Sequence, residues 1–192
     1  MKSVPLLRTG DVIGFSSWDW LDVMINITTY GIPGISVNHV GIVGDYKDEK
    51  VIFEAGTLCS APCIIQGPVF LKTQVHRLND LYRGYWGRLY HYPLVDPLDY
   101  HQRQTLNDFL IGEVGKSYDF LGAVRSAGSW WSYFQGIRYP GDDSRLFCSE
   151  FCAMAHRKIG LFRTINPSKW NPNAFVRAEY EQGILQRRIR FK

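Results

Sequence analysis

The sequence predicts an α+β fold, in which a small antiparallel sheet packs on helices. Apolar segments 39–45 and 51–54 have strand length and flank a polar turn, which is typical of a β-hairpin. Segments 96–115 and 144–160 carry apolar residues at helical spacing and each ends in a glycine, which is typical of helices. A chain of 192 residues is long enough to enclose a core, and we expect one domain over 1–192.

The first third of the chain is expected to begin the sheet. Gly10-Asp11 forms a turn into a short buried strand at 12–15, and the amphipathic pattern of 18–29 indicates a helix. Residues 30–37 contain two Gly and one Pro and form a loop that leads to His39 at the start of the hairpin.

The rest of the chain is expected to add strands and then helices. Residues 55–68 have no clear period and form a loop, and strands return near 74–78 and 87–92. Asp96 caps a helix that stops at Gly115.

Two more helices, with an aromatic loop between them, are expected after Gly115. A helix begins near Asp119, an aromatic loop covers 128–143, and the last predicted helix follows Ser144. No internal repeat or interdomain linker is visible.

The composition limits the classes of function. A net charge of +4 is too weak to indicate nucleic-acid binding without a clustered basic patch. The one basic cluster, at 187–192, alternates with apolar residues, which favours a half-exposed strand over an anionic surface contact. Aromatic residues make up 15% of the chain, which suits a groove, a lipid-like ligand or a dense core.

The N-terminal residues do not resemble an export signal. Residues 1–10 contain no apolar run of signal-peptide length, and no segment reaches the length of a membrane span. We therefore expect synthesis in the cytoplasm and free thiols at the four cysteines. Export, delivery by a phage particle, a peripheral membrane contact and the oligomeric state all stay open.

Cys148 and His39 are the candidates for nucleophilic chemistry. Cys148 opens an apolar stripe near the predicted start of a helix, and His39 opens a strand. A free thiol has a pKa of about 8.5, and both a helix N-terminus and a nearby imidazole favour its thiolate. A cysteine with only a packing role fits the same stripe, so this pattern alone does not decide.

Glu54 is the candidate for orienting His39. A two-residue hairpin turn, at 47–48 or 48–49, places Glu54 on the same face of the sheet as His39, whereas a three-residue turn does not. With a two-residue turn, Glu54 can accept a hydrogen bond from the imidazole and hold its tautomer. The alternative is an exposed glutamate at a strand end.

Six segments occur in a recognisable order: 10–13, 18–29, 38–42, 51–55, 115–119 and 147–151. Two of them carry the chemistry, Asn38-His39-Val40-Gly41-Ile42 and Phe147-Cys148-Ser149-Glu150-Phe151. Together the six resemble the permuted, YiiX-like branch of the NlpC-type, papain-like cysteine hydrolases over residues 9–160. The resemblance implies a circularly permuted papain-like fold with the nucleophile at a helix N-terminus, and it leaves 161–192 as a C-terminal extension.

The resemblance also implies roles for single residues. Cys148 is implied as the nucleophile, His39 as general base and then acid, and Glu54 as the residue that orients the imidazole. Further candidates for oxyanion or substrate binding are Tyr118, Asn38, Ser149, Trp130 and Trp131. A tyrosine packed in the core is the alternative for Tyr118.

The reaction implied by the resemblance is acyl transfer to the thiol, followed by hydrolysis of the thioester. The usual substrate of the wider group is a peptidoglycan stem-peptide amide. We therefore expect a small peptide or amide substrate, no cofactor, no metal and no nucleic acid. The chain departs from that group because it carries no recognisable wall-binding module.

A lipid substrate is the first alternative. Segment 39–45 also resembles the corresponding strand of lecithin retinol acyltransferase-like proteins, which act on lipid esters and amides. In that case Trp130 and Trp131 line a lipid site, unless they pack in the core.

A structural zinc site or an inactive binding module is the second alternative. The pairs Cys59-x-x-x-Cys63 and Cys148-x-x-x-Cys152 have spacings at the loose end of zinc sites. The remaining histidines show no metal-ligand spacing and are expected at the surface or with satisfied hydrogen bonds: His76, His91, His101 and His156.

Overall fold

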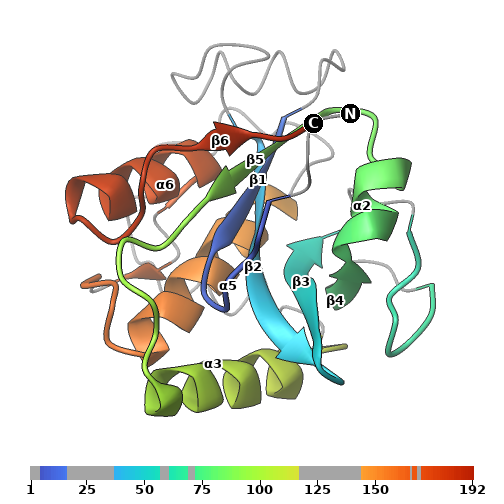
Figure 1. The fold of residues 1–192 in the computed structure, drawn as a ribbon, viewed down its shortest axis with the longest axis horizontal. Helices are drawn as coiled ribbons and strands as arrows, with labels where there is room; N and C mark the ends of the chain where they lie inside the picture. Colours follow the sequence, from blue (N-terminus) through green and yellow to red (C-terminus); the bar gives the residue numbers. More distant parts are fainter. Residues whose placement is uncertain are drawn as a thin grey trace, which may run out of the picture.

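The computed structural model describes residues 5–16, 37–56, 61–68, 72–116, 144–164, 166–167 and 170–192. Six strands in this part of the chain form one antiparallel sheet: β1 (Val12–Ser16), β2 (His39–Tyr46), β3 (Glu49–Gly56), β4 (Lys72–Arg77), β5 (Arg88–Tyr92) and β6 (Ile189–Arg190) (Figure 1). Their order across the sheet is β4-β3-β2-β1-β5-β6.

The described helices are α2 (Leu78–Gly84), α3 (Tyr100–Glu113), α5 (Ser144–Lys158) and α6 (Pro172–Glu181) (Figure 1). Sheet and helices together confirm the predicted α+β fold with a small antiparallel sheet. The predicted helix at 18–29, the helix near Asp119 and the aromatic loop at 128–143 lie outside the described residues. The short helix α2 was not predicted.

β2 and β3 form the predicted hairpin. Tyr46 pairs with Glu49, so Lys47 and Asp48 make a two-residue turn. Their φ angles are 49° and 63°, and a type I′ turn requires positive φ at both positions. The first of the two predicted two-residue turns is therefore the one adopted.

Each face of the sheet carries its own hydrophobic cluster. One face packs against α3, α5 and α6 through a cluster that includes Ile42, Phe53 and Phe151. The other face packs against α2 through a cluster that includes Phe15 and Leu81. The sheet is therefore covered on both sides, and polar groups within it are removed from water.

The helix predicted from Asp96 begins later. α3 starts at Tyr100, and its N-cap is Asp99, which forms a capping box with Gln102. The Asp99 side chain accepts from the Gln102 N–H at 2.8 Å, and the Gln102 side chain accepts from the Asp99 N–H at 3.1 Å. Asp96 was the wrong choice because only Asp99 has a glutamine three residues later to complete this motif.

The C-terminal segment contributes to both the sheet and the core. β6 pairs with β5, and α6 buries Phe175 in the cluster on the α5 face. Leu185 and Phe191 are buried as the alternating pattern predicted, but Ile189 is 53% exposed. The alternation fails at Ile189 because β6 is a two-residue strand at the edge of the sheet.

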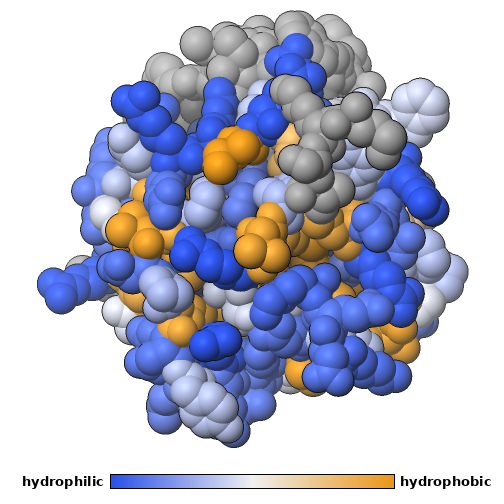
Figure 2. All heavy atoms as spheres, viewed as in Figure 1, coloured by the Kyte–Doolittle hydropathy of each residue, from blue (hydrophilic) through white to orange (hydrophobic). Residues whose placement is uncertain are grey.

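The face of the molecule seen in Figure 2 is largely polar. Its hydrophobic residues form small separate groups. None of the described helices combines the length and the apolar character that crossing a membrane requires.

Candidate active site

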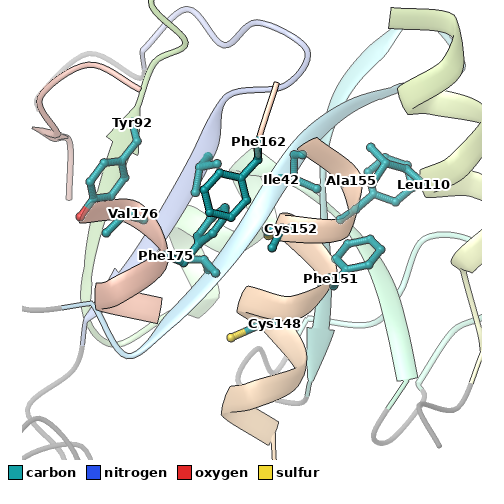
Figure 3. Packing of buried hydrophobic residues seen from close by; sticks show 14 of the residues in the cluster. Ile42, Tyr92, Leu110, Cys148, Phe151, Cys152, Ala155, Phe162, Phe175 and Val176 are labelled. Atoms are coloured by element: carbon teal, nitrogen blue, oxygen red, sulfur yellow. The ribbon is translucent and has the colours of Figure 1, made fainter. Parts of the chain in front are cut away.

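Cys148 lies on the face of α5 that packs against the sheet. Cys148, Phe151, Cys152 and Ala155 are fully buried, and Ile159 is nearly so, which confirms the predicted stripe. Figure 3 shows Cys148, Phe151, Cys152 and Ala155 along α5 within the buried hydrophobic cluster. α5 contacts β2 and β3, the two strands that carry the hairpin residues.

The position of Cys148 within α5 differs from the prediction. α5 begins at Ser144, four residues before Cys148, so the thiol lies in the second turn of the helix. No Gly or Pro occurs at 144–147, and the helical pattern continues back to Ser144. In an α-helix the N–H of the fifth residue bonds to the carbonyl of the first. The Cys148 N–H is therefore directed along the helix and is a poor candidate for an oxyanion donor.

His39 and Glu54 meet on one face of the hairpin. Val43 pairs with Ile52, so odd positions of β2 share a face with even positions of β3. His39 Nε2 and Glu54 Oε2 are 2.5 Å apart, and both side chains are completely buried. The predicted proximity of the two residues is thus present, and Glu54 is not an exposed residue at a strand end.

Gly41 leaves room for this contact. It lies between His39 and Val43 on β2, one position beyond the pair formed by Ile42 and Phe53, so it faces Glu54. A Cβ at Gly41 would lie 2.8 Å from Ile52 Cγ2 and 3.5 Å from Glu54 Cβ. The missing side chain lets the Glu54 carboxylate reach diagonally to the imidazole.

The electrostatics of His39 depend on two anionic neighbours. Burial lowers the pKa of His39, but the negative charge of Cys148, that of Glu54 and their side-chain hydrogen bonds raise it from 6.5 to about 10. Since Nε2 faces Glu54, Nδ1 is the nitrogen left for the thiol, and Nδ1 has no other hydrogen-bond partner among the described groups. The arrangement favours a protonated His39 imidazole between the Cys148 sulfur and the Glu54 carboxylate at neutral pH.

Glu54 remains ionised although it is buried. Burial raises the pKa of Glu54, but the charge of His39, its hydrogen bond and the neighbouring His76 lower it from 4.5 to about 2. A carboxylate that stays charged can hold the proton on the facing nitrogen of His39, which selects the tautomer that leaves Nδ1 directed to Cys148.

His76 is a member of this cluster that the sequence did not reveal. It was expected at the surface or with satisfied hydrogen bonds, yet it is completely buried and neither ring nitrogen has a hydrogen bond of standard geometry in the described structure. His76 Nε2 is 3.1 Å from Glu54 Oε1. That expectation was wrong because a sequence pattern shows strand periodicity but not which strand becomes the neighbour of β3.

Asn38 and Ser149 flank the two reactive candidates along the chain. Asn38 is 2% exposed, its N–H donates to the Phe15 carbonyl, and neither polar atom of its side chain has a described partner. The Ser149 hydroxyl donates to the Trp170 carbonyl, which connects α5 to the segment before α6. Tyr118, Trp130 and Trp131 lie outside the described residues.

The described cysteines do not form a metal site. Cys63, Cys148 and Cys152 are reduced thiols outside any disulfide, and the Cys63 sulfur accepts from the Val75 N–H at 3.4 Å, far along the chain from α5. Burial raises the pKa of Cys152 well above its usual range, so this thiol stays protonated. Within the described ranges no group of three or more His, Cys, Asp or Glu is arranged to hold a metal ion, and Cys59 lies outside them.

Two other buried histidines pair with carboxylates other than Glu54. His91 Nε2 lies 2.7 Å from Asp11 Oδ2, and His156 Nδ1 lies 2.6 Å from Glu179 Oε1. His156 Nε2 also donates to the Gly10 carbonyl at 2.8 Å. The prediction of satisfied hydrogen bonds is therefore confirmed for His156, whereas His91 Nδ1 is buried without a hydrogen-bond partner among the described groups.

A cavity of about 350 Å³ lies between α6 and the C-terminal segment. Its lining includes Arg177, Arg187 and Arg188, and it contains none of the residues clustered around Cys148.

The comparisons with known proteins concern the fold. No family model matches the chain, and no curated protein matches it. The crystal structure of the metalloprotein YiiX from Escherichia coli O157:H7 matches with a TM-score of 0.50 and 20% sequence identity, and the match covers 95% of this chain and 87% of that chain. Similarity at this level of identity establishes architecture rather than activity, and the chain accordingly has a YiiX-like α+β fold.

Proposed function

We propose that this protein is a cysteine hydrolase that cleaves an amide bond through a thioester intermediate. The observation that supports it best is the buried series Cys148, His39 and Glu54, in which an imidazole lies between a thiol and a carboxylate. Nucleophile, base and orienting group in that order form the constellation that activates thiols on many unrelated folds.

In the proposed reaction, the Cys148 thiolate attacks the carbonyl carbon of the substrate and a C–S bond forms. The His39 imidazolium then gives its proton to the leaving amine, the C–N bond breaks, and a thioester remains. Neutral His39 next removes a proton from water, and the resulting hydroxide attacks the thioester carbonyl. The C–S bond breaks, a carboxylic acid leaves, and the thiolate–imidazolium pair is restored.

Asn38 is the described residue best suited to stabilise the oxyanion. Its side-chain amide is buried beside His39 in the chain and has no described partner, so its N–H groups are available to a developing negative charge. Tyr118 is proposed as a second donor because the resemblance implies this role for it. Ser149 is less suited, because its hydroxyl already donates to Trp170.

The proposed substrate is a peptidoglycan-type peptide amide, and it follows from the resemblance. The proposal treats residues 1–192 as one hydrolase domain, because 161–192 supply β6 and α6 to the common sheet and core. Since the side chains of Cys148, His39 and Glu54 have no exposed area, the site has to open before a substrate can enter.

The structural neighbour is described as a metalloprotein. The described residues of this chain do not fit a metal, because Glu54 directs its two oxygens at His39 and His76 separately and no set of three ligands among these residues converges on one point. The proposed reaction therefore contains no step that depends on a metal.

The proposal is tested by alkylating the native protein with limiting iodoacetamide from about pH 5 to pH 9, with the modified cysteine located by peptide mass spectrometry. We expect labelling of Cys148 below neutral pH, with Cys152 one helical turn away as an unreactive internal control. In His39→Ala, labelling at pH 6.5 should fall about a hundredfold, because a thiol with a pKa of about 8.5 is about 1% ionised there.

Equal labelling of Cys148 and Cys152, or labelling of Cys148 that is unchanged in His39→Ala, would remove the proposed nucleophile and favour the binding-module alternative. If the labelling behaves as expected, a panel of wall peptides and lipid esters or amides identifies the substrate. Release of an amine from wall peptides that is absent in Cys148→Ala supports the proposed class, and turnover of lipids alone supports the acyltransferase-like alternative.

A further inference from the structure

His76 and Glu54 are diagonal neighbours on the same face of the sheet. β3 and β4 are antiparallel, with Glu54 opposite Gln74 and Ile52 opposite His76. Residues opposite each other share a face, and residues two positions along remain within reach of long side chains. Glu54 on the middle strand thus lies between an imidazole from β2 and an imidazole from β4.

The two oxygens of Glu54 are engaged differently. Oε2 is paired with His39 at 2.5 Å, whereas Oε1 has no hydrogen bond of standard geometry among the described groups. A buried carboxylate oxygen without a donor is costly. His76 Nε2, at 3.1 Å, is an N–H donor within reach of Oε1, and both side chains are completely buried.

We propose that His76 is a positioning residue of the Cys148 site, which acts by fixing the Glu54 carboxylate so that Oε2 stays directed at His39 Nε2. The inference rests on the proposed cysteine chemistry and assigns His76 no contact with the substrate. Without a donor on Oε1, the carboxylate is free to rotate about its terminal torsion, which is soft, and the contact with His39 loosens. The imidazole then loses the interaction that holds its tautomer.

The test compares two substitutions that introduce an amide group at different distances from the backbone. His76→Gln carries its N–H₂ group near the place of the imidazole Nε2, so it can still donate to Glu54. His76→Asn carries the same group near the place of Nδ1, which is too short to reach. His91→Gln and His91→Asn are the matched controls, because His91 is buried on the same sheet but pairs with Asp11 instead of Glu54.

The readout is the pH profile of Cys148 alkylation by iodoacetamide in the full chain, with the melting temperature of each variant recorded alongside. We expect His76→Asn to lower the rate near pH 6.5 about tenfold, the loss expected when a hydrogen bond to a charged group is removed. His76→Gln should restore most of the rate, and both His91 variants should match the wild type. Glu54→Gln and the double variant Glu54→Gln/His76→Asn should give the same profile, because His76 acts through Glu54.

Equal profiles for His76→Asn and the wild type would overturn the inference, and so would a further loss in the double variant beyond Glu54→Gln. A lower melting temperature in both His76→Asn and His76→Gln, with an unchanged alkylation rate of Cys148, would also overturn it. That result would assign His76 a packing role. These outcomes are distinct from failure of the proposed function, in which the wild type itself shows no His39-dependent labelling of Cys148.

Discussion

Two buried carboxylates, Asp11 directly before β1 and Glu54 within β3, are satisfied in different ways. Asp11 accepts from the N–H groups of Arg8 and Leu94 and pairs with His91, so both of its oxygens are engaged and two of its partners are backbone groups. Glu54 has only imidazole partners, and one of its oxygens has no standard hydrogen bond to a described group. Asp11 therefore fixes a turn, whereas the charge of Glu54 depends on the protonation of His39.

The difference explains why burial alone does not identify a reactive site. A carboxylate saturated by backbone donors is held in place whatever the charge of the histidine beside it. A carboxylate held only by titratable side chains couples its own charge to theirs, and such coupling is the usual mark of a functional site. Substitutions at Glu54 and Asp11 distinguish these two kinds of carboxylate.

The largest effect is expected from Glu54→Gln, compared with Glu179→Gln. Each variant replaces a fully buried glutamate that is paired with a histidine. Glu54→Gln should lower the alkylation rate of Cys148 at neutral pH about tenfold or more, because it removes a charged hydrogen-bond partner from His39. Glu179→Gln should leave that rate within about twofold and lower the free energy of unfolding by about 1–3 kcal/mol. Equal effects on alkylation would contradict the comparison.

Asp11→Asn should act on stability rather than on reactivity. The amide cannot accept at both of its heavy atoms, so at least one of the N–H groups now bound by Asp11 loses its acceptor. We expect the free energy of unfolding to fall by about 3 kcal/mol, as when a buried pair is broken. Urea denaturation measures the loss, and the alkylation profile of Cys148 should stay unchanged. A shifted profile would mean that the Asp11 pair is linked to the site.

Gly41→Ala and Gly44→Ala test whether space beside Glu54 matters. An added Cβ at Gly41 would meet Ile52 Cγ2 at 2.8 Å, and one at Gly44 would meet the Phe53 ring at 2.6 Å. In both variants, overpacking should lower the free energy of unfolding by about 1–3 kcal/mol. Only Gly41→Ala should also slow alkylation of Cys148, because only Gly41 faces Glu54. The same alkylation rate in both variants would count against that role of Gly41.

The last effect expected is a change in the pH dependence of stability. The pKa of His39 is raised to about 10, so its contribution is full below pH 6.5 and is lost as the pH rises through about 10. The pKa of Glu54 is lowered to about 2, so its contribution is full above pH 4.5 and is lost as the pH falls through about 2. The stability difference between the wild type and His39→Ala should therefore be largest between pH 4.5 and 6.5. Urea denaturation from about pH 4.5 to pH 9 checks it, and a difference that is constant up to pH 9 would contradict it.

The local parts of the site could be predicted from the sequence. The alternation of 39–45 and the polar turn predicted which face His39 occupies and, with a two-residue turn, that Glu54 shares it. The stripe from Cys148 to Ile159 predicted which side of α5 is buried. Both depend on contacts between residues close in the chain, where periodicity carries the information.

The rest of the site depends on contacts that periodicity does not encode. His76 reaches Glu54 only because β4 pairs with β3 in one particular register. The hydrogen bond between His156 and Glu179 likewise depends on where α6 packs in the fold. The Asp99 cap, by contrast, is encoded locally, since Asp99 and Gln102 stand at capping-box spacing.

The turn at Lys47 and Asp48 has a consequence for engineering. Its two residues determine which side chains of β3 share a face with His39, so the length of this turn matters more than its composition. Exchange of both residues for Asn-Gly should be tolerated, since that pair also adopts type I′ turns. Insertion of one residue would bring Phe53 or Ala55 beside the imidazole and turn the carboxylate to the opposite face. A hairpin loop far from the thiol would in this way decide whether the imidazole has an acid partner at all.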